Sequence, residues 1–328
     1  MDLHSSKRKS QELVHRICPP DGLKESYTFG MTNLPPSSLV AVEMKDQHGK
    51  ISHVHFNRKK LSRLTTYPSF LGQLNSVFLF ERRVRDVWRY TVTVDKTGVV
   101  FELVSPDRGD PLVASNYHDV LADWAIGLRV LLILLESPHV DEYAWTVDGL
   151  SPRAPAQGEE KGDAGGALAA YLTKMVARLA LPKGKYAVVI ANPVPYHCSL
   201  SWMAATRTTC GNWQPPKLNS VVRNHVWKTL WKQDWINKDF LARCAQYAPH
   251  TILNCCTSSC AKAVTRALLD SGFGTSLFTT SHPAYTWNRY FGIQKKNALP
   301  GHGPNVFRIL PDGNKVLWPM PHVNSACG

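Results

Sequence analysis

The sequence predicts an α/β fold, with a central, mostly parallel sheet flanked by helices and a smaller β-rich domain before it. The apolar run Arg129–Leu135 shows no alternation, which is typical of a strand buried on both faces of a parallel sheet. Residues 185–191 and 251–256 have the same pattern, and residues 274–280 predict a shorter fourth strand. Segments with helical spacing separate these runs, so we expect right-handed βαβ units.

The sequence before residue 115 lacks the long apolar runs of the α/β region. Short segments rich in β-branched and aromatic residues, several of them alternating, predict a separate antiparallel sheet. These segments are residues 39–44, 51–56, 76–80, 88–94 and 99–104. We therefore expect an accessory domain over residues 1–115 and a catalytic α/β domain over residues 116–328.

The other helices, strands and loops are predicted from the spacing of apolar residues and from residues such as Pro and Gly that interrupt helices and strands. Residues 151–166 are rich in Pro, Gly, Ala and acidic residues, which predicts a mobile surface segment. After residue 292 the pattern predicts loops and one strand, at residues 306–310. Helical spacing predicts helices at residues 117–127, 167–179, 219–232, 239–247 and 260–271.

The net charge of the chain indicates which kind of molecule the protein binds. Lys and Arg exceed Asp and Glu by 38 − 25 = 13, which favours a polyanion, and nucleic acid before membrane because no basic amphipathic anchor is present. In the accessory domain, basic residues alternate with aromatic ones that could stack on unpaired bases. A solvated sheet face would give the same pattern. The candidate DNA-binding residues there are Arg82, Arg83 and Arg85.

The eight cysteines and the absence of a signal segment indicate a compartment. The cysteines are unevenly spaced and form no secreted disulfide framework. The chain lacks a charged-then-apolar leader, and its longest apolar run is too short to cross a bilayer. We expect a cytoplasmic protein that is not bound to a membrane. Cys255, Cys256 and Cys260 lack the paired spacing of a zinc site, so no metal is predicted.

Candidate functional residues follow three of the predicted strands. Ligands of open α/β sheets bind beyond the carboxyl ends of the strands, so polar residues at these positions are the first candidates. The second strand is followed by Asn192, and the fourth by His282-Pro283 and an aromatic, basic turn. The first strand is followed by Glu136, Ser137, His139, Asp141 and Glu142.

This ordered set resembles the motifs of the uracil-DNA glycosylase superfamily. Leu135–His139 with the acids and the Gly/Pro loop after them resemble the first motif, Ala191-Asn192 the base-recognising asparagine, and Ser281–Ala284 the His-Pro-Ser motif. The resemblance covers residues 128–289. It implies a monofunctional DNA glycosylase that flips a base, hydrolyses its N-glycosidic bond, leaves an abasic site and needs no cofactor.

The resemblance also implies roles for single residues. His282 would donate a hydrogen bond to the base oxygen that gains negative charge, and Asn192 would bind the edge of a flipped pyrimidine. Glu136 ranks first and Asp141 second for positioning water or stabilising the oxocarbenium-like sugar. Either of them, or Glu142, could instead cap a helix or carry a surface charge. The best-known members have aspartate where this chain has Ser137.

The base pocket is expected to be open to bulky bases. Classical uracil enzymes have a tyrosine after the motif proline that blocks a C5 substituent, whereas this chain has His139. Ser137, His139 and Tyr143 are therefore assigned to base binding with Asn192. Within the superfamily the chain is similar to bacterial antiphage enzymes, which implies excision of glucosylated 5-hydroxymethylcytosine from phage DNA.

The turn after His282 is the expected DNA contact. Flipping a base out of a duplex requires a wedge in the vacated stack. Tyr285 and Trp287 are large and flat, but they could equally pack into the core. The candidates for contact with duplex or locally single-stranded DNA are Ser281, Tyr285, Trp287, Asn288 and Arg289.

The sequence is also compatible with three other functions. The first is repair of uracil or other deaminated bases. The second is non-catalytic nucleic-acid binding by the same fold, for which the substitution at Ser137 is the best argument. The third is a metal-dependent nuclease, which is disfavoured because the acids cluster in one loop.

Overall fold

The computed structural model describes residues 39–45, 50–57, 83–103, 128–139, 142–146, 149–157, 163–198, 219–274, 276–292 and 304–318. The expected strand at residues 76–80 and the expected helix at residues 117–127 lie outside these ranges. The chain forms two compact units. The larger comprises residues 84–142, 153–195 and 234–328, and the smaller comprises residues 1–83, 143–152 and 196–233.

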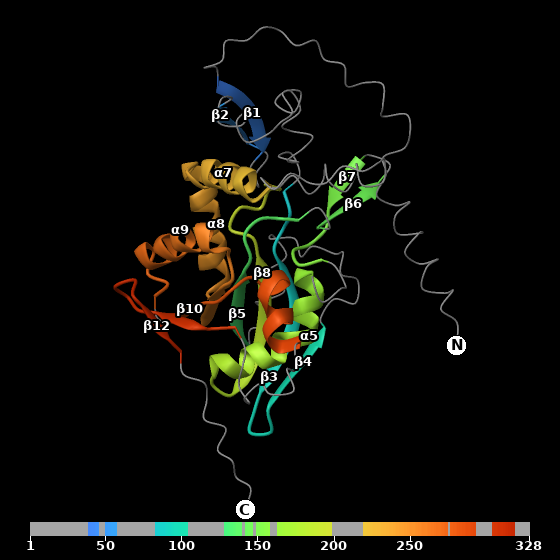
Figure 1. Ribbon diagram of the computed structural model, residues 1–328, viewed down its shortest axis with the longest axis vertical. Coiled ribbons are helices and arrows are strands. Elements are labelled where there is room, and N and C mark those ends of the chain that lie inside the picture. Colours follow the sequence, from blue (N-terminus) through green and yellow to red (C-terminus); the bar gives the residue numbers. More distant parts are fainter. Residues whose placement is uncertain are drawn as a thin grey trace, which may run out of the picture. The chain divides into compact units, whose positions relative to one another are not determined.

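The described strands of the larger unit form one eight-stranded mixed sheet in the order β12-β11-β10-β9-β5-β8-β3-β4 (Figure 1). The four central strands, β10, β9, β5 and β8, run parallel, and the pairs on either side are antiparallel. The predicted α/β fold class is confirmed. Parallel pairing of the described strands is confined to the four central strands of the sheet. The strands are β3 (Val87–Val94), β4 (Val99–Leu103), β5 (Leu128–Leu134), β8 (Gly184–Ala191), β9 (Thr251–Asn254), β10 (Leu277–Thr279), β11 (Phe307–Ile309) and β12 (Lys315–Leu317).

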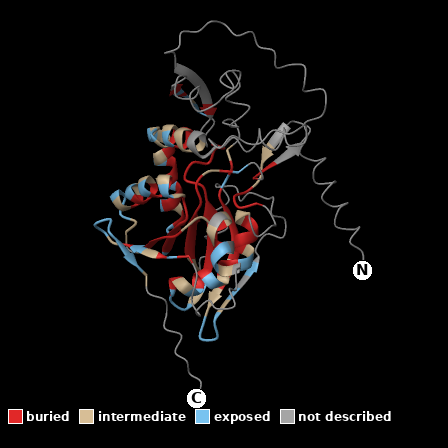
Figure 2. Cartoon of the chain, in the orientation of Figure 1, coloured by how far each residue is buried: buried red, intermediate tan, exposed pale blue. Residues whose placement is uncertain are grey.

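Strand β5 is the centre of this sheet. It pairs in parallel with β8 on one side and with β9 on the other, so its backbone is hydrogen-bonded along both edges. Its side chains from Val130 to Leu134 are all buried, as the central red strands of Figure 2 illustrate. Burial on both faces is the reason that this segment is apolar without alternation.

The expectation that β3 and β4 belong to a separate N-terminal sheet is wrong. Strand β3 pairs antiparallel with β8, from Val87 opposite Ile190 to Val94 opposite Gly184. Its residues Trp88 and Tyr90 are buried in this sheet. β-branched and aromatic composition indicates that a strand forms, but it does not identify the neighbour, because any pleated surface satisfies it.

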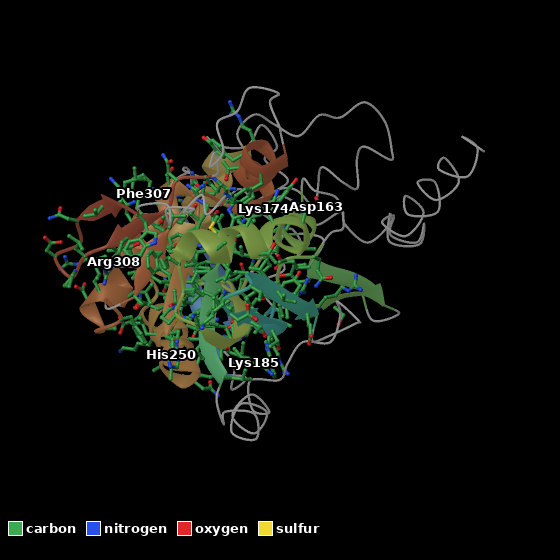
Figure 3. The ribbon with its side chains drawn as sticks, turned by 90° about the horizontal axis from the view of Figure 1, so that it is seen from below. Asp163, Lys174, Lys185, His250, Phe307 and Arg308 are labelled. Atoms are coloured by element: carbon green, nitrogen blue, oxygen red, sulfur yellow. The ribbon has the colours of Figure 1, made fainter. Side chains whose placement is uncertain are left out.

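Helices cover both faces of the sheet. Helix α5 (Ala164–Leu179) and the π-helix η4 (Pro283–Gly292) pack on the face to which Leu131, Ile133 and Leu253 point. Asn254 points the other way, and its amide donates to Ala261 O and Thr265 Oγ1 of α9 (Ser258–Asp270), each at 3.1 Å. Helix α8 (Asp234–Tyr247) packs beside α9. In Figure 3, Lys174 of α5 and His250 after α8 lie on opposite sides of the strands.

The described residues of the smaller unit form two antiparallel strand pairs and a helix. Strands β1 (Leu39–Lys45) and β2 (Ile51–Asn57) form the predicted antiparallel pair. Strands β6 (Tyr143–Thr146) and β7 (Gly149–Pro152) form a hairpin that the sequence pattern did not indicate. Helix α7 (Asn219–Trp231) is close to its prediction, and its residues Val226, Trp227 and Leu230 are buried.

The segment after His282 is the π-helix η4 and not a turn. Trp287 is fully buried in it, and the indole Nε1 donates a hydrogen bond of 3.0 Å to Ser281 O. Its ring packs edge-to-face on Phe291 at a centroid distance of 6.3 Å, and Phe291 stacks on Tyr171 of α5 at 5.5 Å. Trp287 therefore anchors η4 to the core, and its expected role as a DNA wedge is wrong.

This packing predicts a large stability loss for Trp287→Ala. The substitution empties a fully buried site, so the free energy of unfolding should fall by roughly 3–5 kcal/mol in a denaturant titration. Tyr290→Ala is the matched control, because Tyr290 is in the same helix and is 45% exposed. It should change stability by less than about 1 kcal/mol. Equal stability of Trp287→Ala and the parent protein would contradict the core assignment.

Candidate active site

The predicted site segments meet at one edge of the sheet. Because β10, β9, β5 and β8 are parallel, their carboxyl ends lie together. They lead in that order to His282, Thr257, Glu136 and Asn192. Neighbouring strands are about 4.8 Å apart, so the ends of β10 and β8 are roughly 14 Å apart along this edge. Glu136 and Asn192 follow adjacent strands, and His282 follows the strand at the far side.

Asn192 forms a buried polar pair with Glu142. The Asn192 Nδ2 donates to Glu142 Oε2 at 3.0 Å, and the Ala156 N–H donates to Glu142 Oε1 at 3.0 Å. Asn192 is 0% exposed and Glu142 is 3% exposed. The structure therefore brings Asn192 together with Glu142, an acid of the first-strand loop that was not ranked for catalysis.

Burial raises the pKa of Glu142 to about 7, because the ionised carboxylate loses its hydration. The hydrogen bonds from Ala156 and Asn192 and the charges of His139 and Arg89 act in the opposite direction and offset part of this effect. A carboxyl group with a pKa near neutrality can both accept and donate a proton at physiological pH. Such groups are concentrated at functional sites.

Arg89 of β3 holds the loop that carries Ala156. Its guanidinium donates to Ala156 O at 2.7 Å and to Pro155 O at 2.8 Å, and Arg89 is itself buried. Residues 154–157 are buried as well, so the expectation of a mobile surface segment over residues 151–166 is wrong for this part. Residues 153–157 form a loop as predicted, whereas residues 151–152 end β7 and residues 164–166 begin α5. Composition does not show that a charged strand residue binds the carbonyl groups of this loop.

A second buried network holds the backbone at Asn192. Arg243 of α8 donates to Asp86 Oδ2 at 2.5 Å and to Asp239 Oδ2 at 3.0 Å. The Tyr247 hydroxyl also donates to Asp86 Oδ2, at 2.7 Å. The Arg243 Nη2 donates to Asn192 O at 3.1 Å and to Pro193 O at 3.4 Å. The end of β8 is thus fixed through its carbonyl groups.

The charge of Arg243 is secured by its partners. Burial alone lowers the pKa of Arg243, but the carboxylates of Asp86 and Asp239 raise it well above its ordinary value. A buried ion pair is expensive to break, because the remaining partner stays charged and dehydrated. The sequence did not indicate this network, since Asp86 and Arg243 are 157 residues apart.

One polar atom of the Asn192 side chain is not used by the hydrogen bonds described above. The amide oxygen Oδ1 is buried and has no hydrogen-bond partner within the described part of the protein. Buried polar atoms without a partner are rare in folded proteins, and each one calls for an explanation. A hydrogen-bond donor on a bound molecule would satisfy this acceptor.

Glu136 is held at the start of α9. Its carboxylate oxygen Oε2 accepts from the Thr257 N–H at 3.2 Å and also from the Thr257 hydroxyl. Thr257 is the N-cap residue of α9, and the positive end of a helix dipole stabilises an anion there. Glu136 therefore lies against the N-terminus of α9, but it is not itself an N-cap residue, because that position belongs to Thr257.

The other predicted site residues are distributed as follows. Tyr143 is buried and packs edge-to-face with His197 at 6.1 Å. Ser137, Ser281, His282 and Arg83 are partly buried, whereas His139, Arg85 and Arg289 are exposed. Asp141 and Arg82, and the side chains of Tyr285 and Asn288, lie outside the described residues.

The cysteines beside the site are protonated thiols. Burial raises the pKa of Cys255 and Cys256, and the Cys256 thiol donates to Leu135 O. Within the described ranges, no three His, Cys, Asp or Glu side chains form a group that could hold a metal ion. None of the helices described has the length and apolar character needed to cross a membrane.

Comparisons with known proteins give no relative. No protein-family model, curated protein or solved structure matches the chain. The chemistry of the site must therefore be argued from its own residues.

The raised pKa predicts a pH-dependent stability effect for Glu142→Gln. An acid whose folded pKa of about 7 exceeds its unfolded value of 4.5 favours folding at low pH, and this contribution is lost as pH rises from 4.5 to 7. Glutamine carries no titrating group, so Glu142→Gln does not lose this stability as pH rises. The variant should therefore be more stable than the parent at pH 8 by up to about 3 kcal/mol, and the difference should vanish near pH 4.

Thermal unfolding at a series of pH values tests this. Glu102→Gln is the matched control, because Glu102 is exposed on β4, and it should follow the parent at every pH. A stability difference between Glu142→Gln and the parent that is the same at pH 4 and pH 8 would show that Glu142 does not titrate in this range.

Proposed function

We propose that the protein is a monofunctional DNA glycosylase of the uracil-DNA glycosylase superfamily. It flips a modified pyrimidine out of DNA and hydrolyses the bond between base and sugar, which leaves an abasic site. The substrate is glucosylated 5-hydroxymethylcytosine of phage DNA, so the activity defends a bacterial host against infection.

The observation that carries this proposal is the buried amide of Asn192 with its unpartnered oxygen. It lies at the carboxyl end of a central parallel strand, where ligands of α/β sheets bind. An amide in this position can form a hydrogen bond with the edge of a flipped base. The first-motif segment follows the adjacent strand β5, and the His-Pro segment follows β10 at the same edge.

The reaction requires charge stabilisation on both sides of the breaking bond. The base leaves with negative charge, and His282 supplies a hydrogen bond to it. The sugar becomes oxocarbenium-like and requires a nearby carboxylate and a positioned water molecule. Glu136 and Asp141 remain the proposed acids for this role.

The net charge and the residue after the motif proline support the substrate class. The net charge of +13 favours binding to a polyanion such as DNA. The residue after the motif proline, His139, is exposed and leaves the position beside the base C5 without the tyrosine that would block it. A glucosylated hydroxymethyl group at C5 requires such an opening.

A non-catalytic DNA-binding protein of the same fold is the second candidate. The contacts of Glu136 with Thr257 favour it, because a carboxylate held against a helix N-terminus has less freedom to position water. Measured base release separates the two functions, since a binding protein leaves every base attached.

The deciding experiment uses the full-length protein and a panel of DNAs that carry different modified bases. Alkaline cleavage detects abasic sites, and mass spectrometry identifies the released base. We expect release from DNA with glucosylated 5-hydroxymethylcytosine. The variants Glu136→Gln, Asp141→Asn and His282→Ala should release base more slowly, and at least one acid variant should lose about 10²-fold or more. Full activity in all three would overturn the assigned roles.

Arg289 predicts how the enzyme engages duplex DNA. It is exposed on η4, seven residues after His282, and can neutralise a phosphate beside the flipped nucleotide. Arg289→Ala should reduce activity on duplex DNA several-fold, with a smaller effect on single-stranded DNA. Arg266→Ala removes the same charge from the exposed face of α9 and serves as the control. Equal losses in both variants would indicate only a general effect of net charge.

A further inference from the structure

The orientation of the Asn192 amide is fixed by a chain of hydrogen bonds that begins at Ala156. A backbone N–H can only donate, so Glu142 Oε1 must accept from Ala156 at 3.0 Å. An ionised carboxylate can only accept, so Asn192 must turn its NH₂ group toward Glu142 Oε2, also at 3.0 Å. The amide oxygen is consequently the atom of this side chain that has no partner among the described residues.

The backbone of Asn192 does not allow the amide to move away from Glu142. Arg243 holds the carbonyl oxygens of Asn192 and Pro193, and Arg243 is itself fixed by Asp86 and Asp239. The loop that carries Ala156 is held in the same way by Arg89. Both ends of the chain of hydrogen bonds are thus anchored by buried arginines.

A fixed acceptor discriminates between pyrimidines. Cytosine carries an amino group at position 4, which donates, whereas uracil and thymine carry a carbonyl oxygen there, which only accepts. The amide oxygen of Asn192 attracts the amino group and repels the carbonyl. A uracil can offer this oxygen only its N3–H, which is flanked by two carbonyl oxygens.

We propose that Glu142 is the specificity-determining positioning residue of the site. By holding the Asn192 amide with its oxygen free, it selects pyrimidines that carry a 4-amino group over pyrimidines that carry a 4-keto group. This inference rests on the proposed glycosylase function and adds to it the residue that distinguishes the two base classes.

The substitution Glu142→Gln should reverse the selection. The Ala156 N–H still needs an acceptor, so the oxygen of the introduced glutamine amide takes that position and its NH₂ group faces Asn192. Asn192 must then turn its own oxygen toward this NH₂ group and present its own NH₂ group to the base. The opposite orientation of the introduced amide would place two donors against each other and leave the Ala156 N–H unsatisfied.

The test compares two matched oligonucleotides under single-turnover conditions. One carries glucosylated 5-hydroxymethylcytosine and the other glucosylated 5-hydroxymethyluracil, which differ only at ring positions 3 and 4. The parent protein should favour the cytosine form by roughly 10²-fold, and Glu142→Gln should favour the uracil form. Glu102→Gln on β4 should keep the preference of the parent. Circular dichroism verifies that both variants fold.

A second measurement needs no substitution. Below pH 7 the protonated Glu142 can donate to the Asn192 oxygen, so the preference of the parent for the cytosine form should weaken as pH falls from 8 to 6. Among the described residues, the charged groups that act on Glu142 are His139 and Arg89. Because the charge of His139 also acts on Glu142, Glu142→Gln is the reference. Its preference should not depend on pH.

The outcomes separate the two proposals. No release of either base by the parent protein would overturn the proposed function itself. Release with an unchanged preference in folded Glu142→Gln, or a preference of the parent that is the same at pH 6 and pH 8, would overturn only the role of Glu142. Reversal of the preference would support both.

Discussion

Burying a charged or polar group in a protein interior is costly unless hydrogen bonds replace its lost hydration, and this constraint governs the end of strand β8. Asn192 lies there with no exposed surface. Its side chain is compensated by Glu142, and its carbonyl oxygen is compensated by Arg243. Each of these partners is buried and needs further partners of its own. The polar network therefore extends from the site into β3, α8 and the loop at residues 155–156.

This network has a thermodynamic cost that a purely structural core would avoid. An ionised Glu142 in the interior destabilises the folded protein at neutral pH, and an apolar residue would not. Proteins commonly accept such losses at sites where chemistry or recognition requires the polar group. The unpartnered oxygen of Asn192 is a second cost of the same kind. Both energetic costs occur in the hydrogen-bonded pair of Glu142 and Asn192. For this reason we propose a functional role for that pair.

The rigid sheet explains how such a pair is kept in place. Strands β5 and β8 pair along their whole length, so the segments that follow them leave the sheet in a fixed register. Arg89 lies on β3, which pairs with the other edge of β8, and it holds the loop that supplies the Ala156 N–H. The donor and the acceptors are therefore positioned by strands of the same sheet. Groups held in this way need little reorganisation when a ligand binds.

The sequence by itself determined where the main strands and helices lie and which residues end the parallel strands. Apolar runs without alternation identify β5, β8 and β9, because a strand buried on both faces must be apolar throughout. Local patterns also marked Asn192 as a candidate, since a polar residue directly after such a strand lies where ligands bind. They did not distinguish Glu142 from Glu136, because burial depends on the path of the loop and not on neighbouring residues.

Only the tertiary structure decided which distant groups compensate one another. Asp86 and Arg243 are 157 residues apart, and Glu142 and Asn192 are 50 apart, so no local pattern relates them. The placement of β3 in the central sheet and of Trp287 in the core likewise depends on partners that are remote in sequence. Strand propensity and aromatic content show that a residue is suited to burial or stacking. The surface against which it packs is determined by the fold as a whole.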